Sequence, residues 1–153
     1  MRKHRSDSDA EAEFVSLYHR HSAAVTAYAL RRCNAEDAAD LVSETFIVAW
    51  RRFESMPDEP AVRPWLFGGA RKALANQRRG NRRRNELVRK ASTYLEPRFS
   101  AMPAIEGFAE SQEVLDALKT LPVADQELLA LTAWEQLKPA EIAVTLGVSS
   151  AIV

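Results

Sequence analysis

The chain has 153 residues, of which 46% are hydrophobic and 27% charged, so it is large and apolar enough to bury a core. Its only cysteine, Cys33, excludes an intrachain disulfide and a cysteine-rich zinc site and favours a reducing, cytoplasmic setting. No apolar run approaches the roughly 18 to 20 residues of a membrane span, and the N-terminus turns acidic where a signal peptide would be apolar. We therefore expect neither a membrane span nor an export signal.

The formal net charge of zero conceals a strongly basic segment. Residues 61–90 hold 10 basic residues and one acidic residue, whereas residues 1–60 hold 8 and 11, and residues 91–153 hold 3 and 9. Most of the basic residues in the middle segment are arginines, which bind phosphates and base edges better than lysines do. A solvated helix face is the alternative explanation, but the excess of positive charge favours contact with nucleic acid.

Apolar residues recur at intervals of three and four along most of the chain, which predicts an all-α fold. We expect a first helix from Ser8, with Glu11 completing a capping box, to about Cys33. Its inward face comprises Phe14, Leu17, Tyr18, His21, Val25 and Tyr28. A second helix is expected from Asn34 to Phe53, and its inward stripe comprises Ala38, Leu41, Val42, Thr45, Phe46, Ala49, Trp50 and Phe53.

The third predicted helix is the basic one. Pro57 and Pro60 predict a loop over residues 54–63, and Pro64 suits the first turn of the helix that follows. The buried side of this helix comprises Trp65, Leu66, Ala70, Ala73 and Leu74. The basic residues fall on the remaining side, so the charge is presented in one broad direction.

Three glycines bear on this helix. Gly68 and Gly69 each cost about 1 kcal/mol in a helix interior relative to alanine. They therefore require a reason such as the close approach of another backbone, unless the helix is weak at that point. Gly80 is the expected C-terminal stop of the helix.

The last third of the chain predicts a linker and a second helical unit. Residues 91–110 contain two prolines and no helical periodicity, so we expect a flexible linker. Short helices are predicted around residues 114–121, over residues 126–134 and over residues 139–146. A helix-turn-helix pattern closes the sequence, with Gly147 making the turn and Val148 entering the core.

The order of these parts resembles a bacterial sigma factor of the extracytoplasmic-function (ECF) type over about residues 11–153. The stretch AEDAADLVSETFIVAWRRF (35–53) is similar to the helix by which the family's second domain binds the clamp helices of core RNA polymerase. The stretch RPWLFGGARKALANQRRGNRRR (63–84) is similar to the helix that melts and reads the minus-ten promoter element. The stretch LKTLPVADQELLALTAWEQLKPAEIAVTLGVSS (118–150) is similar to the fourth domain, which reads the minus-35 element.

This resemblance implies two small helical domains joined by a flexible linker. Residues 8–90 would form a sigma domain 2-like bundle, residues 91–110 the linker, and residues 111–153 a sigma domain 4-like helix-turn-helix. Because the sequence stops where the family's recognition helix begins, we expect the second domain to be incomplete at its C-terminus. The implied function is to bind core RNA polymerase and to direct promoter recognition, DNA melting and transcription initiation.

The resemblance also implies site residues. Those expected to bind the polymerase are Glu36, Asp37, Asp40, Leu41, Ser43, Glu44 and Ile47. Those expected to bind the minus-ten element are Trp65, Arg71, Lys72, Asn76, Arg78, Arg79, Arg82 and Arg83, and a partial minus-35 site comprises Ser149 and Ser150. Beside the resemblance, the outer face of the second helix is acidic with an apolar centre, which suits a basic helical partner. Trp65 suits either base stacking or core packing.

The implied partners are the clamp helices and flap of core RNA polymerase, promoter DNA, and an anti-sigma factor. We expect no metal, no cofactor and no enzymatic activity, because His19 and His21 point to different helix faces and the sequence has no phosphate loop or nucleophile motif. The alternative function is a stand-alone helix-turn-helix DNA-binding regulator, which would need an intact recognition helix.

Overall fold

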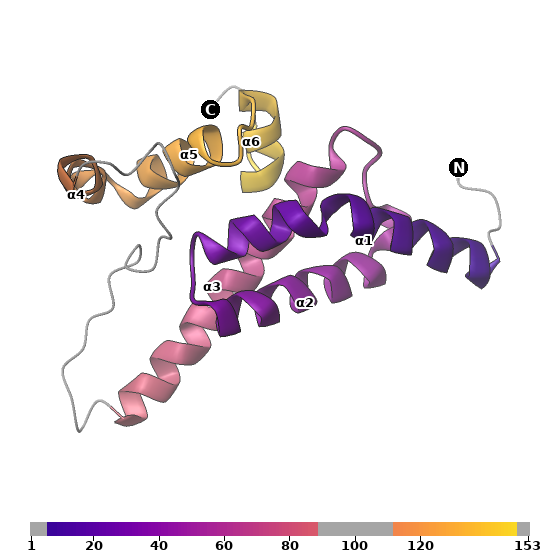
Figure 1. The fold of residues 1–153 in the computed structure, drawn as a ribbon, viewed down its shortest axis with the longest axis horizontal. Helices are drawn as coiled ribbons and strands as arrows, with labels where there is room; N and C mark the ends of the chain where they lie inside the picture. The colour runs from indigo at the N-terminus through magenta and orange to yellow at the C-terminus, as the bar shows by residue number, and fades with distance from the viewer. Residues whose placement is uncertain (1–5, 89–111, 150–153) are drawn as a thin grey trace.

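The computed structural model describes residues 6–88 and 112–149 (Figure 1). The helices are α1 (Asp7–Leu30), α2 (Ala35–Arg51), α3 (Val62–Val88), α4 (Gln112–Thr120), α5 (Val123–Ala133) and α6 (Pro139–Leu146), with a 3-10 turn η1 over Phe53–Ser55. Within these two described stretches every regular element is a helix, which confirms the predicted all-α class. The expected linker over residues 91–110 lies outside the described residues.

Side-chain caps set where the first two helices begin. The hydroxyl of Ser6 accepts a hydrogen bond from Asp9 N at 3.3 Å, so α1 begins slightly before the expected capping box at Ser8. The side chain of Asn34 accepts a hydrogen bond from Asp37 N at 2.8 Å and caps α2 where the sequence predicts. Each cap satisfies a backbone N–H that the first turn of a helix leaves without a partner.

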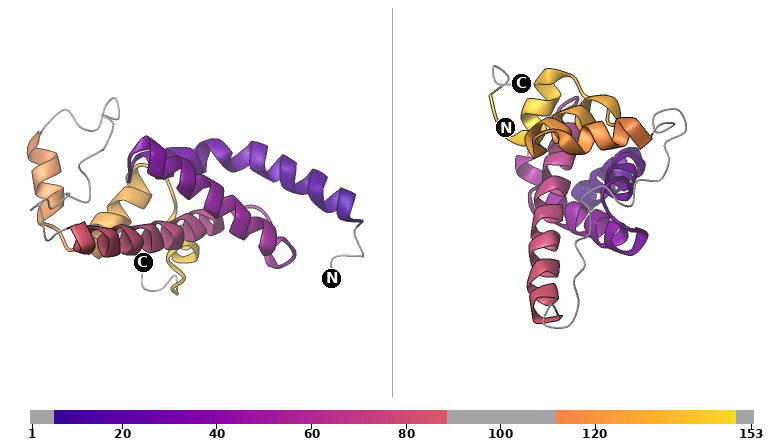
Figure 2. Two further views of the ribbon diagram at one scale, coloured as in Figure 1. Left: turned by 90° about the horizontal axis from the view of Figure 1, so that it is seen from below. Right: turned by 90° about the vertical axis from the view of Figure 1, so that its left-hand side faces the viewer.

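α1, α2 and the first half of α3 pack together as a bundle (Figures 1 and 2). Tyr28 and Phe67 stack in its centre, with ring centroids 5.3 Å apart and an interplanar angle of 18°. The buried residues around them include Leu17, Val25, Phe46, Ala49, Phe53, Met56, Leu66 and Ala70. Full burial of one such large apolar side chain contributes about 1.5–3 kcal/mol, so this cluster is the main source of stability of the bundle.

Some predicted inward positions are exposed. Tyr18 and Trp50 are 42% and 43% exposed, because they lie at the edge of the apolar stripes rather than at their centres. Val148 is 42% exposed and does not enter the core, because the buried face of α6 is turned toward α3 and not toward the segment after Gly147.

Two predicted helix ends are also wrong. α1 ends at Leu30 rather than near Cys33. α3 continues through Gly80 to Val88, because one glycine costs only about 1 kcal/mol and the arginines that follow are good helix formers. The basic half of α3 therefore projects as a helix beyond α1 and α2 (Figure 2).

α5 and α6 pack directly on the bundle. Leu131, Leu137 and Ile142 belong to the same buried cluster as the bundle core, and α6 lies against α3. The buried hydroxyl of Thr145 donates a hydrogen bond to the carbonyl oxygen of Pro64 at 2.9 Å. The two helical units thus share one continuous hydrophobic core.

The contact between α6 and α3 explains Gly68. A Cβ at residue 68 would lie 3.0 Å from the carbonyl oxygen of Thr145, whereas a Cβ at residue 69 would lie 3.8 Å from Thr45 Cγ2. Only the first of these distances is shorter than an ordinary van der Waals contact. The close approach of another backbone is therefore the reason for Gly68, and Gly69 has no such requirement.

This difference predicts opposite outcomes for two neighbouring substitutions. Gly69→Ala should raise the free energy of unfolding by up to about 1 kcal/mol, because alanine has the higher helix propensity. Gly68→Ala should gain less or lose stability, because its new methyl group pushes the Thr145 carbonyl away. Urea denaturation of the two variants measures the difference, and equal stabilisation by both would contradict the packing described here.

Candidate functional site

α2 presents one face to the core and the opposite face to solvent. Exposed residues on the outer face are Glu36, Asp40, Ser43, Glu44 and Ile47, and Ile47 is 51% exposed. Asp37 is half-buried at the edge of this face, where its carboxylate accepts a hydrogen bond from Asn34 Nδ2 at 2.9 Å. The outer face therefore carries carboxylates followed by an exposed apolar side chain, and it is acidic as the sequence predicts. We call it the α2 acidic face.

Leu41 does not belong to the α2 acidic face. Its side chain is 1% exposed and packs in a small buried cluster with Ala29, Ala38, Ala73 and Leu74. The helical period of 3.6 residues places position 41 on the side of Ala38 and not on the side of Ile47. The prediction that Leu41 contacts the polymerase is corrected on this ground, since its side chain is not available to a partner.

Two aromatic residues that the sequence assigned to the core are exposed, Trp50 on α2 and Tyr18 on α1. Trp50 lies one helical turn after Ile47, and its ring contacts Phe14 at a centroid distance of 5.0 Å. Tyr18 of α1 contacts Phe46 at 4.8 Å. Both side chains are substantially exposed, and each is held by a ring contact. Trp50 lies at the edge of the inward stripe of α2, next to Ile47 on the helical wheel, and that position alone leaves open whether its side chain is buried or exposed.

α3 carries the basic residues along its outer side. Lys72, Asn76, Arg79, Arg82 and Arg83 are exposed, while Arg71 and Arg78 are half-buried. The side chain of Arg79 donates a hydrogen bond to that of Asn76, and Arg78 Nη2 donates to the carbonyl oxygen of Arg32 at 3.3 Å. Trp65 is half-buried and packs against the main hydrophobic core. The structure thus gives Trp65 a packing role and leaves part of its ring accessible.

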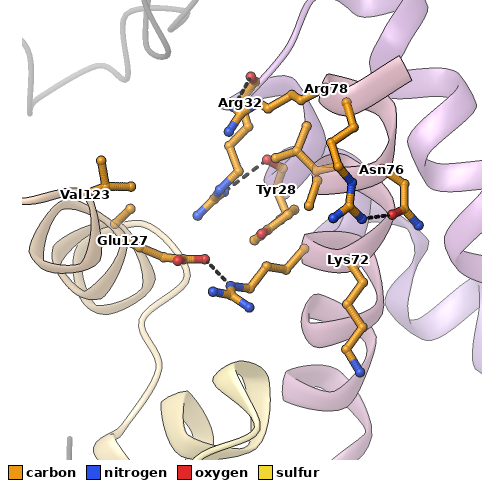
Figure 3. Close-up of a pocket in the computed structure, with 12 residues that line it drawn as sticks. Tyr28, Arg32, Lys72, Asn76, Arg78, Val123 and Glu127 are labelled. Atoms are coloured by element: carbon orange, nitrogen blue, oxygen red, sulfur yellow. Dashed lines mark hydrogen bonds and ion pairs between the residues drawn. The ribbon is translucent and has the colours of Figure 1, made fainter. Parts of the chain in front are cut away.

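A cavity of about 460 Å³ separates α3 from α5 (Figure 3). Its basic lining residues are Arg32, Arg71, Lys72, Arg78 and Arg79, and Glu127 reaches it from α5. Arg71 Nε donates a hydrogen bond to Glu127 Oε1 at 2.7 Å. This hydrogen bond is the main reason that the pKa of Arg71 is raised. Partial burial of the guanidinium acts in the opposite direction and lowers the pKa by less. The cavity is therefore cationic, with one acidic group already paired to its wall.

A buried ion triad lies beside the cavity. Arg31 Nη1 and Arg32 Nη1 each lie 3.0 Å from a different carboxylate oxygen of Glu135, whose side chain is only 3% exposed. The guanidinium of Arg32 also lies over the ring of Tyr28, 3.6 Å from its centroid. Burial of Tyr28 raises the pKa of its hydroxyl. Arg32 Nη2 is buried and has no hydrogen-bond partner among the described residues.

The remaining candidates are at the margins of the described chain. Ser149 is exposed just after α6, and Ser150 lies outside the described residues. Within residues 6–88 and 112–149, no group of three or more His, Cys, Asp and Glu side chains is arranged to hold a metal ion. None of the helices in these two stretches has the length and apolarity needed to cross a membrane.

Comparison with known proteins finds two matching family models and several relatives. Sigma-70 region 2 matches residues 17–84, and Sigma-70, region 4 matches residues 111–153. ECF RNA polymerase sigma factor SigL of Mycobacterium tuberculosis is 32% identical over 148 residues, which cover 94% of this chain and 82% of SigL. RNA polymerase sigma factor NccH of Alcaligenes xylosoxydans xylosoxydans is 27% identical over 143 residues, which cover 90% and 76%.

A solved structure supports the fold. The structure of CnrH in complex with the cytosolic domain of CnrY matches with a TM-score of 0.57 at 23% identity and covers 95% of this chain and 82% of that one. The region 2 match includes most of α1, all of α2 and most of α3, and the region 4 match includes α4–α6. The matched relatives are polymerase sigma factors and not stand-alone DNA-binding regulators. The chain belongs to the ECF sigma factors of RNA polymerase, and its function is that of a sigma factor in transcription initiation.

Proposed function

We propose that the α2 acidic face is the surface by which this sigma factor binds the clamp helices of core RNA polymerase. The observation that carries the proposal is an exposed Ile47 that follows exposed carboxylates on the same face of a helix whose opposite side is buried. An apolar centre with a charged rim is typical of a specific protein interface. The residues assigned to it are Glu36, Asp37, Asp40, Ser43, Glu44 and Ile47, together with Trp50.

The same proposal assigns the outer side of α3 to the minus-ten element. Lys72, Arg79, Arg82 and Arg83 supply exposed positive charge for the phosphates, and Asn76 supplies a side-chain amide that can read a base edge. Arg71 and Arg78 stand closer to the bundle. Docking of the α2 acidic face on the polymerase would position α3 across the DNA, because α2 and α3 are packed against each other. Bond formation in RNA synthesis belongs to the polymerase.

In the proposed function, each of three segments of the chain has its own role. Residues 8–90 act as the unit that binds the polymerase and the minus-ten element, and residues 91–110 link it to residues 111–153. The second unit contacts the polymerase flap and contributes Ser149 and Ser150 to a partial minus-35 contact.

We also propose an anti-sigma partner and action in the cytoplasm, where the polymerase works. The solved complex of CnrH with the cytosolic domain of CnrY supports a protein partner for this chain. Exposed apolar side chains at Tyr18, Ile47 and Trp50 offer such a partner a surface that it would share with the polymerase. Occupation of this surface by one partner would exclude the other.

Charge reversal on α2 tests the polymerase contact. Asp40→Lys combined with Glu44→Lys should reduce the affinity for core polymerase by about 100-fold or more, because it places like charges against a basic partner. Both positions are exposed, so the fold should be retained. Fluorescence anisotropy of the labelled full chain measures the affinity.

A matched control makes the same change in charge at positions outside the α2 acidic face. Glu11→Lys combined with Glu54→Lys alters exposed residues of α1 and η1. This control should bind core polymerase as the parent chain does. Parental affinity in the Asp40 and Glu44 variant would refute the assignment of the α2 acidic face.

Neutralisation on α3 tests the DNA contact. Arg79→Ala combined with Arg83→Ala should weaken binding of the polymerase complex to a short minus-ten DNA. The slope of log affinity against log salt should fall by about 1.4 to 1.8, since each lost phosphate contact removes roughly 0.7 to 0.9. Lys119→Ala combined with Lys138→Ala removes the same charge from region 4 and should leave this DNA affinity unchanged. Equal effects of the two pairs would indicate a nonspecific response to net charge.

A further inference from the structure

The cavity between α3 and α5 has an excess of positive charge on its wall (Figure 3). Five cationic side chains line it, and the carboxylate of Glu127 is the acidic group among its lining residues. Glu135 pairs with Arg32 from outside the cavity, so cations outnumber carboxylates even when Glu135 is counted. Neither Lys72 nor Arg79 forms an ion pair with a carboxylate in the described parts of the chain. Because cations gathered in a cleft concentrate anions, this wall favours an anionic ligand.

Three lining residues also present hydrogen-bond donors without an acceptor among the described residues. Glu127 accepts from Arg71 Nε at 2.7 Å, which leaves both Nη nitrogens of Arg71 without a partner there. The side chain of Arg32 is directed into the cavity (Figure 3) and is only 7% exposed, and its buried Nη2 has no partner. The hydroxyl of Tyr28 also points into the cavity and makes no hydrogen bond there. Donors on buried residues normally have acceptors, so these groups indicate a ligand that carries several acceptor oxygens.

The size and the apolar part of the lining indicate an organic ligand. The volume of about 460 Å³ lies within the range of about 300–1,000 Å³ that is usual for sites of small organic molecules, and an inorganic anion would leave most of it empty. Ala75, Val123 and Ala130 supply apolar surface beside the cationic groups. Arginine binds phosphate oxygens with a planar fork of N–H donors. The lining therefore combines groups that bind phosphate with a wall that can cover an organic group.

We propose that this cavity binds a small organic diphosphate of the size and charge of a nucleoside diphosphate. The diphosphate oxygens accept hydrogen bonds from the cationic wall and the organic group lies against Val123 of α5. Glu127 keeps its hydrogen bond to Arg71 Nε, because the ligand uses the Nη nitrogens. The residues assigned to the diphosphate are Tyr28, Arg32, Lys72, Arg71 and Arg79.

This site does not depend on the proposed contact between α3 and DNA, although DNA is another source of phosphate. The cavity is bounded by Val123, Glu127 and Ala130 of α5 as well as by α3, so its ligand must fit between two helices. DNA can also reach exposed arginines of α3 that do not line the cavity, namely Arg82 and Arg83. Substitutions inside and outside the cavity therefore distinguish a small diphosphate from DNA.

The first test is isothermal titration of the full chain with ADP, with inorganic pyrophosphate and with adenosine, in the absence of divalent cations. ADP should bind and should raise the Tm of the chain, since a ligand that binds only the folded state stabilises it. Pyrophosphate should bind about 5-fold or more weakly than ADP, and adenosine should not bind. The absence of ADP binding would overturn the proposal, and equal affinity for ADP and pyrophosphate would overturn its assignment of an organic ligand.

Two pairs of substitutions on α3 test the position of the site. Lys72→Ala combined with Arg79→Ala removes two cations from the cavity wall and should weaken ADP binding by about 10-fold or more. Arg82→Ala combined with Arg83→Ala removes the same charge from exposed positions of the same helix outside the cavity. This matched control should keep the parental ADP affinity within about 2-fold. Equal losses in both pairs would mean nonspecific attraction to a basic helix and would overturn the site.

The opposite wall is tested on α5. Val123→Glu adds a carboxylate to the cavity and should weaken ADP binding by about 5-fold or more. Leu129→Glu makes the same change at another exposed apolar residue of α5 that does not line the cavity, so it should keep the parental affinity. Parental ADP affinity in Val123→Glu would place the ligand outside the cavity and overturn the proposal.

Tyr28→Phe tests one donor without a change in charge. It removes only the hydroxyl and keeps the ring that stacks on Phe67, so the Tm of the ligand-free chain and the affinity for core polymerase should stay parental. ADP binding should weaken by about 5-fold. Unchanged ADP affinity would overturn the assignment of the Tyr28 hydroxyl to the diphosphate.

Binding of a short minus-ten DNA to the polymerase complex separates this inference from the proposed function. Both pairs of substitutions on α3 lie on the surface assigned to DNA, so both should weaken DNA binding, whereas only the cavity pair should weaken ADP binding. If neither pair alters DNA affinity, the DNA assignment of α3 has failed and the ADP result stands. If both pairs weaken DNA binding and the parent chain does not bind ADP, only the present inference has failed.

Discussion

The backbone contact between α6 and α3 at Gly68 is the constraint on which the rest of the structure depends. It joins the two sigma factor regions in one hydrophobic core, and it requires a residue without a side chain within the first half of a long helix. The glycine lowers the helix propensity of α3, and the packing of Leu131, Leu137 and Ile142 more than offsets that loss. The buried triad of Arg31, Arg32 and Glu135 then fixes the orientation of region 4, because a buried carboxylate is stable only when it is paired.

In region 2, α2 and α3 each bury one face in the core and expose a charged face, acidic on α2 and basic on α3. α2 buries its apolar stripe and turns its carboxylates and Ile47 outward. α3 packs Leu66, Ala70 and Leu74 against the same core and turns its arginines outward. Because the two helices pack against each other, a partner on one face has a defined position relative to a ligand on the other. In the proposed function, this packing gives a polymerase bound to α2 a defined position relative to DNA bound to α3.

Local features of this fold could be predicted from the sequence. The cap at Asn34, the helix over residues 139–146 and the burial of Ala38, Thr45 and Ala49 follow from capping chemistry and helical periodicity. That Gly68 and Gly69 require a reason such as a close backbone approach, unless the helix is weak there, could also be predicted from helix propensity. The identity of the approaching segment could not, because Thr145 is far away along the chain and nothing in either local pattern specifies the pairing.

The candidate site was predictable to a similar degree. The acidic character of α2 and the basic character of α3 are visible in composition and spacing. The exposure of Tyr18 and Trp50 was not, because residues at the edge of an apolar stripe are buried or exposed according to the width of the tertiary contact. The ion pair between Arg71 and Glu127 joins two regions and likewise depends on how they dock. Long-range packing is thus the part of the structure that sequence patterns leave open.

The most direct test of this account is a titration of the labelled full chain with core RNA polymerase, with minus-ten DNA alone and with both together, over a range of salt concentrations. The account predicts tight binding to polymerase, weak and salt-sensitive binding of the free chain to DNA, and a large gain in DNA affinity when polymerase is present. Equally tight DNA binding with and without polymerase would contradict it, because the chain would then be a self-sufficient DNA-binding protein.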